Sequence, residues 1–128
     1  MINEDRSATV VVMEDHDIIV IMDRYPATSG HMLVLPKEHI ATIYEMPAEL
    51  GDRIMRTAAL ISKMIKEKLS PDGLNLIQAN GAAAGQTVSH FHLHIVPRYK
   101  GDAVNLRFGH GNVPEDINEL RRIASLLK

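Results

Sequence analysis

The sequence predicts an α+β fold in which an antiparallel five-stranded sheet packs on one long helix, with a short helix at the C-terminus. The first observation is one long stretch whose apolar residues recur every three or four positions, the pattern of a helix with one buried face. The second is a set of five short apolar segments bounded by turn-forming residues, which indicates strands. Three of these segments precede the helix and two follow it, an order that favours an α+β architecture. The 128 residues, 45% of them apolar, suit a single domain over residues 1–128.

The first three strands are expected before the long helix. Thr9–Glu14 and Asp17–Asp23 are β-branched and apolar, and the two residues between them suit the turn of a β-hairpin. A turn-rich stretch follows, after which His31–Leu35 is predicted as the third strand, ended by Pro36.

The long helix is expected to begin at Pro47, because proline suits the first position of a helix. Ser70–Gly73 contains a proline and a glycine and should stop it. Its predicted buried face consists of Leu50, Ile54, Ala58, Ile61, Ile65 and Leu69.

Two strands and a short helix complete the expected fold. Leu74–Asn80 is predicted as the fourth strand and His90–Pro97 as the fifth, with the glycine–alanine loop Gly81–Gln86 between them. The last helix should open at Pro114, with an apolar side formed by Ile117, Leu120, Ala124 and Leu127.

Composition narrows the classes of function. The formal net charge is −2 and the basic residues are scattered, so nucleic acid is not an expected partner. The chain has no cysteine, which excludes disulfides and cysteine-ligated zinc. No apolar run is long enough to cross a membrane, and the acidic segment Met1–Arg6 does not resemble a signal peptide. We therefore expect a cytoplasmic protein.

Three histidines alternate along the predicted fifth strand. On an extended strand, His90, His92 and His94 would share one face, while the apolar residues between them face the core. Three imidazoles in a row are a poor way to build a core, because each needs a hydrogen-bond partner once buried. This pattern therefore predicts a functional site.

One interpretation of the histidine row is a metal site. The Cα atoms of His90 and His94 would lie roughly 13 Å apart on a strand, too far for all three rings to reach one ion easily. A metal held with the help of His31 or His39 remains an alternative.

The other interpretation is an anionic, phosphate-bearing substrate. A neutral imidazole is a nucleophile, so the central His92 could attack phosphorus while its neighbours orient it and stabilise the leaving group. Gly81 and Gly85 in the preceding loop allow close backbone approach, and their N–H groups could point at phosphate oxygens. Gln86, Thr87 and Ser89 add hydrogen-bonding groups.

These segments resemble the histidine-triad superfamily. The motif runs from Asn80 through Gly85-Gln86-Thr87 to His90-x-His92-x-His94 and ends at Arg98, and Gly30–Ile40 is similar to a second segment of that family. The similarity extends from about Val12 to Tyr99. It implies a homodimer in which two five-stranded sheets join into one. It also implies hydrolysis or transfer of a nucleoside monophosphate through a covalent nucleotidyl-histidine.

The resemblance also assigns roles. His92 corresponds to the nucleophile, His94 to the histidine at the α-phosphate and leaving group, and His90 and His31 to the pair that supports the orientation of the nucleophile. His39 is interpreted as a structural or surface residue. Contacts to phosphate or leaving group are implied for Asn80, Gly85, Gln86 and Thr87, and contacts to the ribose hydroxyls for Asp23.

Pro97-Arg98 after the triad is more similar to dinucleoside-polyphosphate hydrolases and prokaryotic members than to the phosphoramidase-type branch. We therefore expect an adenine nucleotide with a substituted α-phosphate, such as a dinucleoside polyphosphate or an adenosine phosphoramidate, with no cofactor or bound metal. Gly101–Gly111 is the segment expected to set the substrate. Two alternatives remain: a nucleotide-binding regulatory module with vestigial turnover, and a histidine-ligated metalloenzyme.

Overall fold

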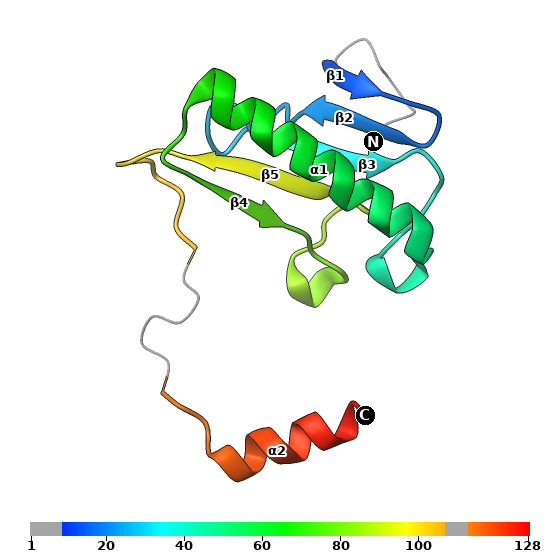
Figure 1. The fold of residues 1–128 in the computed structure, drawn as a ribbon, viewed down its shortest axis with the longest axis vertical. Coiled ribbons are helices and arrows are strands. Elements are labelled where there is room, and N and C mark those ends of the chain that lie inside the picture. The colour runs from blue at the N-terminus through cyan, green and yellow to red at the C-terminus, as the bar shows by residue number, and fades with distance from the viewer. Residues whose placement is uncertain (1–8, 107–112) are drawn as a thin grey trace.

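The computed structural model describes residues 9–106 and 113–128, and its five strands form one antiparallel sheet in the order β1-β2-β3-β5-β4. Figure 1 shows α1 lying across this sheet. The predicted α+β class, the number of strands and the element order are confirmed. Two predictions fall wholly or partly outside the described residues. One is the absence of a signal peptide at the N-terminus, and the other concerns residues 107–111 of the segment expected to set the substrate. The strands are β1 Val11–Glu14, β2 Ile18–Met22, β3 Met32–Pro36, β4 Gly73–Ile77 and β5 Leu93–Arg98.

The long helix α1, Ala48–Leu69, begins one residue after the predicted start. Pro47 is its N-cap, and Ser70 ends it in the left-handed conformation with a φ of 49°. The centre of the predicted buried face is confirmed, with Ile54, Ala58, Ile61 and Ile65 against the sheet. At its two ends Leu50 is only partly buried and Leu69 is exposed. Burying each isoleucine contributes about 1.5–3 kcal/mol, so this stripe fixes the helix to the sheet.

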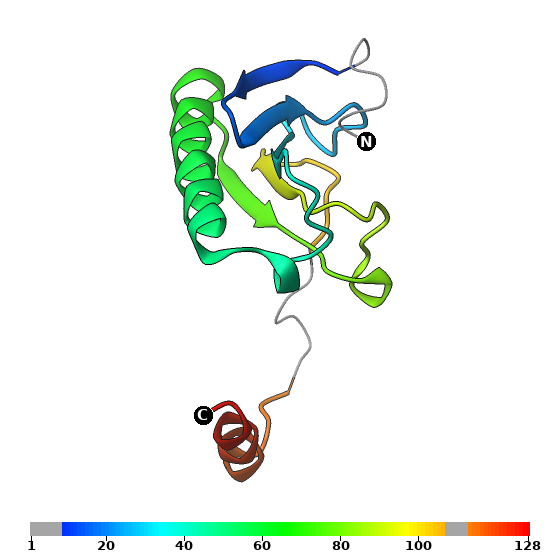
Figure 2. The ribbon, with the colours of Figure 1, turned by 90° about the vertical axis from the view of Figure 1, so that its right-hand side faces the viewer.

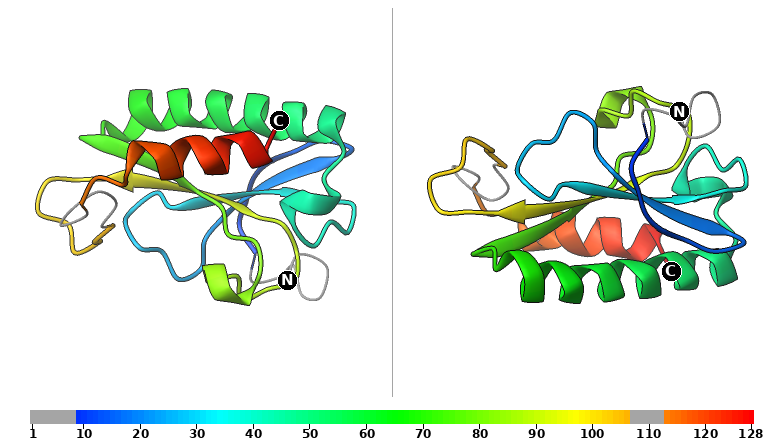
Figure 3. Two further views of the ribbon diagram at one scale, coloured as in Figure 1. Left: turned by 90° about the horizontal axis from the view of Figure 1, so that it is seen from below. Right: turned by 90° about the horizontal axis from the view of Figure 1, so that it is seen from above.

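The two faces of the sheet are covered differently. Figure 2 and both views of Figure 3 show α1 on one face of the sheet, where Val20, Val34 and Ile95 point. The alternate residues form a second buried cluster on the opposite face: Ile19, Ile21, Leu33 and Leu35. Leu33 pairs with His94, so His94 lies on the face opposite α1.

The fifth strand begins at Leu93 and not at His90, so the expectation that three histidines share one strand face is wrong. His94 is the one triad histidine inside the strand, because pairing with β3 extends only from Val34↔Leu93 to Met32↔Ile95. Beyond that point Pro36 has no N–H to continue the ladder. Phe91 donates its N–H to the Ile40 carbonyl instead, at 2.6 Å.

The fourth strand is also shorter than the predicted Leu74–Asn80, since its pairing with β5 ends at Ile77↔His94. Two single-turn 3₁₀ helices, η2 (Ile43–Glu45) and η3 (Ala82–Ala84), lie in the connections.

The C-terminal helix α2, Ile117–Leu126, begins three residues after the predicted start, because Asp116 caps it by accepting the Asn118 N–H. It stands clear of α1 and the sheet in Figures 1 and 2. Its apolar side is exposed, so the assignment of residues 1–128 to one domain stays a prediction. None of the helices in the described parts of the chain is long and apolar enough to cross a membrane. The exposed apolar residues are Ile117, Leu120, Ile123, Leu126 and Leu127.

Candidate functional site

His92 lies just before β5, and its ring is fixed by a backbone group. Its Nδ1 lies 2.8 Å from the carbonyl oxygen of His90. A carbonyl only accepts, so Nδ1 carries the hydrogen and the lone pair of the neutral ring is on Nε2. The ring of His94 meets that of His92 nearly edge-on, with centroids 4.8 Å apart. A nucleophilic nitrogen is thereby oriented beside a second imidazole.

His90 supports this arrangement through its backbone, while its ring points elsewhere. The ring Nε2 donates to the Pro36 carbonyl at 2.8 Å, and the side chain is buried. Burial lowers the pKa of His90 and the Pro36 carbonyl opposes that shift. The exposed His39 has its ring centroid 5.6 Å from that of His90. Within the described residues, no contact joins His39 to His92.

His31 contacts His94 and not the nucleophile. Nε2 of His31 lies 2.9 Å from Nδ1 of His94 and 3.3 Å from a carboxylate oxygen of Asp23. That oxygen is 4.0 Å from Nδ1 of His94. The sequence alone gives no signal for this trio, because 63 residues separate His31 from His94. The pairing of β3 with both β2 and β5 brings the three side chains together.

The trio Asp23, His31 and His94 is the one group in the described part of the chain whose ligand atoms lie close enough together to hold a metal ion. The hydrogen bonds of this trio argue against metal binding. The backbone N–H of Ala27 donates to Nδ1 of His31 at 3.0 Å, so the hydrogen of the neutral ring is on Nε2. A metal needs a nitrogen lone pair, and here an N–H points into the space where the ion would sit.

The site favours neutral imidazoles. Partial burial lowers the pKa of His94 to about 4, helped by the neighbouring His92 and His31 and opposed by Asp23. Burial also lowers the pKa of His31, again against the pull of the Asp23 carboxylate. Both rings are therefore uncharged at neutral pH.

The glycine–alanine loop closes on itself, which corrects the expected role of its N–H groups. The Gly85 N–H donates to Ala82 and the Gln86 N–H to Gly81 in a tight turn. The N–H of Gly81 donates to the Gln86 side chain at 2.7 Å. Both glycines have a positive φ, 92° and 94°, so they serve the turn. Thr87 is exposed, and its N–H makes no hydrogen bond within the described residues.

Asn80 and Gln86, expected at the phosphate, make internal hydrogen bonds. The Asn80 Oδ1 accepts the Ile43 N–H at 2.7 Å, and its amide also pairs with Gln78. The Gln86 Nε2 donates to the Ala41 carbonyl at 2.7 Å. These two amides tie the loop to residues 41–43, a use that requires tertiary contacts and leaves no sequence pattern.

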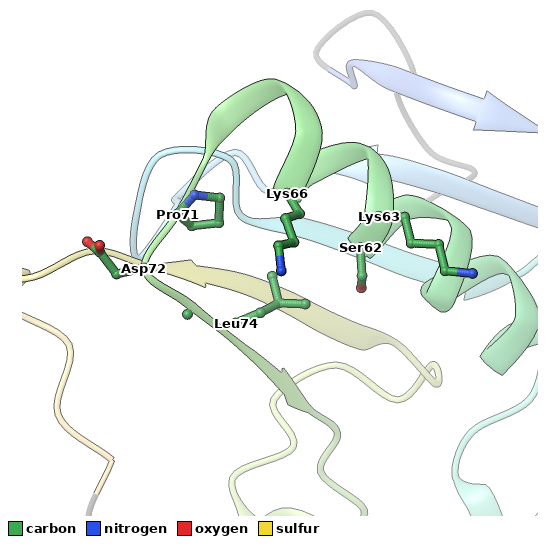
Figure 4. A pocket seen from close by; sticks show the side chains of 7 residues that line it. Ser62, Lys63, Lys66, Pro71, Asp72 and Leu74 are labelled. Carbon is green, nitrogen blue, oxygen red and sulfur yellow. The ribbon is translucent and has the colours of Figure 1, made fainter.

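A separate hollow of about 360 Å³ lies between the end of α1 and the start of β4, lined by Ser62, Lys66, Asp72 and Leu74 among others (Figure 4). Leu76, which follows on β4, pairs with Ile95 and so points to the α1 face. None of the histidines in the described part of the chain lines this hollow, so the chemistry is assigned to the histidine site.

This chain matches known proteins both in sequence and in structure. The HIT domain model matches residues 4–101. "Protein hit" of Bacillus subtilis is 38% identical over 123 residues, covering 89% of this chain and 85% of that protein. A crystal structure of a histidine triad nucleotide-binding protein from Candida albicans superposes with a TM-score of 0.80 at 27% identity, covering 93% of this chain and 85% of the other.

One of the relatives is named after an enzymatic activity. "Adenylylsulfatase HINT3" of Arabidopsis thaliana is 37% identical over 98 residues, which cover 77% of this chain and half of that protein.

Proposed function

Because this chain belongs to the HIT domain family, we propose that it hydrolyses or transfers a nucleoside monophosphate through attack of His92 on phosphorus. The observation that carries the proposal is the hydrogen bond from His92 Nδ1 to the His90 carbonyl, which leaves Nε2 as a free nucleophile. His94, whose pKa is well below neutrality, stands beside it as an uncharged hydrogen-bond donor.

The proposed substrate is an adenine nucleotide whose α-phosphate carries a leaving group, such as a dinucleoside polyphosphate or an adenosine phosphoramidate. A relative named as an adenylylsulfatase supports this class, because adenylyl sulfate also has a substituted α-phosphate. Thr87 is exposed and its N–H makes no hydrogen bond within the described residues, so it is proposed as one backbone donor to phosphate, and Asp23 is proposed to reach the ribose hydroxyls.

The first step forms a bond from His92 Nε2 to phosphorus and breaks the bond from phosphorus to the leaving group, which departs with the electron pair. The hydrogen stays on Nδ1, so the modified ring is positive and the His90 carbonyl 2.8 Å away stabilises it. In the second step water attacks phosphorus, the bond to Nε2 breaks, and the proton of the water passes to solvent. The imidazole returns to its neutral form.

The test compares the wild type with His92→Asn and a matched control, His16→Asn. The side chain of His16 is 97% exposed and belongs to the β1–β2 turn. We expect His92→Asn to lower turnover on the order of 10⁴-fold while AMP affinity survives, and the control to keep full activity. The substrate panel contains an adenosine phosphoramidate, dinucleoside tri- and tetraphosphates and a nucleotide sugar.

Rapidly quenched wild type should carry an AMP-sized mass adduct that His92→Asn lacks. Near-normal turnover of His92→Asn would refute the mechanism. Tight AMP binding with no turnover of any substrate in the panel would instead support a regulatory nucleotide-binding module.

We also propose that the protein acts as a homodimer joined along β4. This strand lies at the edge of the sheet, and unpaired strand edges tend to associate. Leu76 on β4 is 44% exposed and Met55 on α1 is 54% exposed. The buried Ser62 Oγ, which lies in the wall of the hollow in Figure 4, lacks a hydrogen-bond partner among the described residues. A second copy would cover the apolar groups and provide such a partner.

A further inference from the structure

His31 holds its ring hydrogen in one place because its other nitrogen is occupied. Nδ1 accepts the backbone N–H of Ala27 at 3.0 Å, and a backbone amide cannot reverse that role. A second hydrogen on Nδ1 would face the Ala27 hydrogen directly. His31 is therefore a neutral ring with its N–H on Nε2, and its side chain is only 8% exposed.

That N–H lies between two acceptors. Nδ1 of His94 is 2.9 Å from His31 Nε2, and a carboxylate oxygen of Asp23 is 3.3 Å away. The other oxygen of Asp23 accepts the Tyr25 N–H at 2.8 Å, which fixes the carboxylate in this position. Because His94 Nδ1 accepts from His31, the hydrogen of His94 is on Nε2, the nitrogen left to meet a substrate.

Asp23 opposes this arrangement. Its carboxylate oxygen is 4.0 Å from His94 Nδ1, and a carboxylate at that distance favours a hydrogen on the nitrogen that faces it. Among the described residues, the charged or titratable side chains facing His94 are Asp23, His31 and His92. Of these, His31 alone presents a hydrogen to Nδ1 and keeps that nitrogen in use as an acceptor.

We propose that His31 is a positioning residue that keeps the hydrogen of His94 on Nε2, directed at the phosphoryl oxygens, by occupying both His94 Nδ1 and Asp23. Without His31, the carboxylate draws the hydrogen of His94 to Nδ1. Nε2 then presents a lone pair to the phosphoryl oxygens, and the hydrogen bond to the transition state is lost. This inference rests on the proposed function for its effect on turnover, whereas the position of the hydrogen is measurable without substrate.

The first test is ¹⁵N NMR of the histidine side chains in the wild type and in His31→Asn. The Asn side chain can still accept the Ala27 N–H but is too short to reach His94. We expect the wild type to have His94 protonated on Nε2 at neutral pH, and His31→Asn to have it protonated on Nδ1. A wild-type His94 protonated on Nδ1 would overturn the proposal, whatever the activity of the protein.

The second test is a double-mutant cycle on kcat. His31→Asn should lower kcat about 10²-fold in the wild-type background, with a smaller change in KM, because a transition-state donor is lost. In an Asp23→Asn background the same substitution should lower kcat no more than about 3-fold, since no carboxylate remains to draw the hydrogen away. His31→Gln, whose longer amide can still donate to His94, should retain most of the wild-type kcat.

An equal loss of kcat in both backgrounds would overturn the proposal, because a merely structural role of His31 does not depend on the charge of Asp23. Inactive His92→Asn together with equal losses in the cycle would refute the inference and leave the proposed function standing. Active His92→Asn would refute the proposed function, and the NMR result would still decide where the hydrogen of His94 lies.

Discussion

Mild acid should destabilise this protein through His94. The ring lies between His92 and His31 and its side chain is 27% exposed, so charging it in the folded state is unfavourable. In the unfolded chain nothing opposes protonation, and the pKa returns to the ordinary value of 6.5. The folded value of about 4 is lower, so the unfolded state binds more protons as the pH falls. The stability from this group is complete above pH 6.5 and is lost as the pH falls toward 4.

The size of the effect follows from the two pKa values. The difference between a pKa of 6.5 and one of about 4, at about 1.36 kcal/mol per pH unit, gives roughly 3 kcal/mol for the complete loss. At pH 5 the same two values give a loss of about 2 kcal/mol relative to pH 7.5. Burial lowers the pKa of His31 and His90 too, so both add to the loss in the same direction.

The assay is urea unfolding at pH 7.5 and pH 5 at one protein concentration, on the wild type, His94→Asn and the exposed-site control His16→Asn. The wild type and the control should lose nearly the same free energy of unfolding between the two pH values, because the pair that His16 forms with Asp17 is exposed to solvent and contributes little. His94→Asn should lose about 2 kcal/mol less. An identical loss in His94→Asn and the wild type would refute the reasoning, because it would mean that His94 is freely protonated in the folded protein.

Three further outcomes are expected. Prolonged dialysis against EDTA should leave turnover unchanged, because the N–H of His31 points into the candidate metal position. Loss of activity that returns on adding zinc would contradict this prediction. Light scattering at micromolar protein should give a dimer, and a mass of about 14 kDa would exclude the proposed association along β4. Ile61→Ala should lower the free energy of unfolding by about 3 kcal/mol in urea titrations, since Ile61 is 1% exposed in the core. Leu60→Ala, at a residue 48% exposed, should cost under about 1 kcal/mol, and equal costs would contradict the assigned core.

Local sequence patterns are enough to predict the architecture and the motif of the site. Helical periodicity identifies the buried face from Ile54 to Ile65, and turn residues separate the five strands. Both features depend on residues close together in the chain, which is why they can be recognised without knowing the fold. The spacing of His90, His92 and His94 is local in the same sense, and by itself it indicates a functional site, with a metal and a phosphate-bearing substrate as the two interpretations.

The role of each imidazole depends on the tertiary structure, because the partners that fix a ring are distant in the chain or belong to the backbone. The Pro36 carbonyl holds the ring of His90, and His31 reaches His94 across two paired strands. Asn80 and Gln86 are polar in the sequence, and the fold uses them to join the loop to residues 41–43. Side-chain identity gives the chemistry that is available, but a ring nitrogen becomes donor or nucleophile only when the opposite nitrogen has a partner.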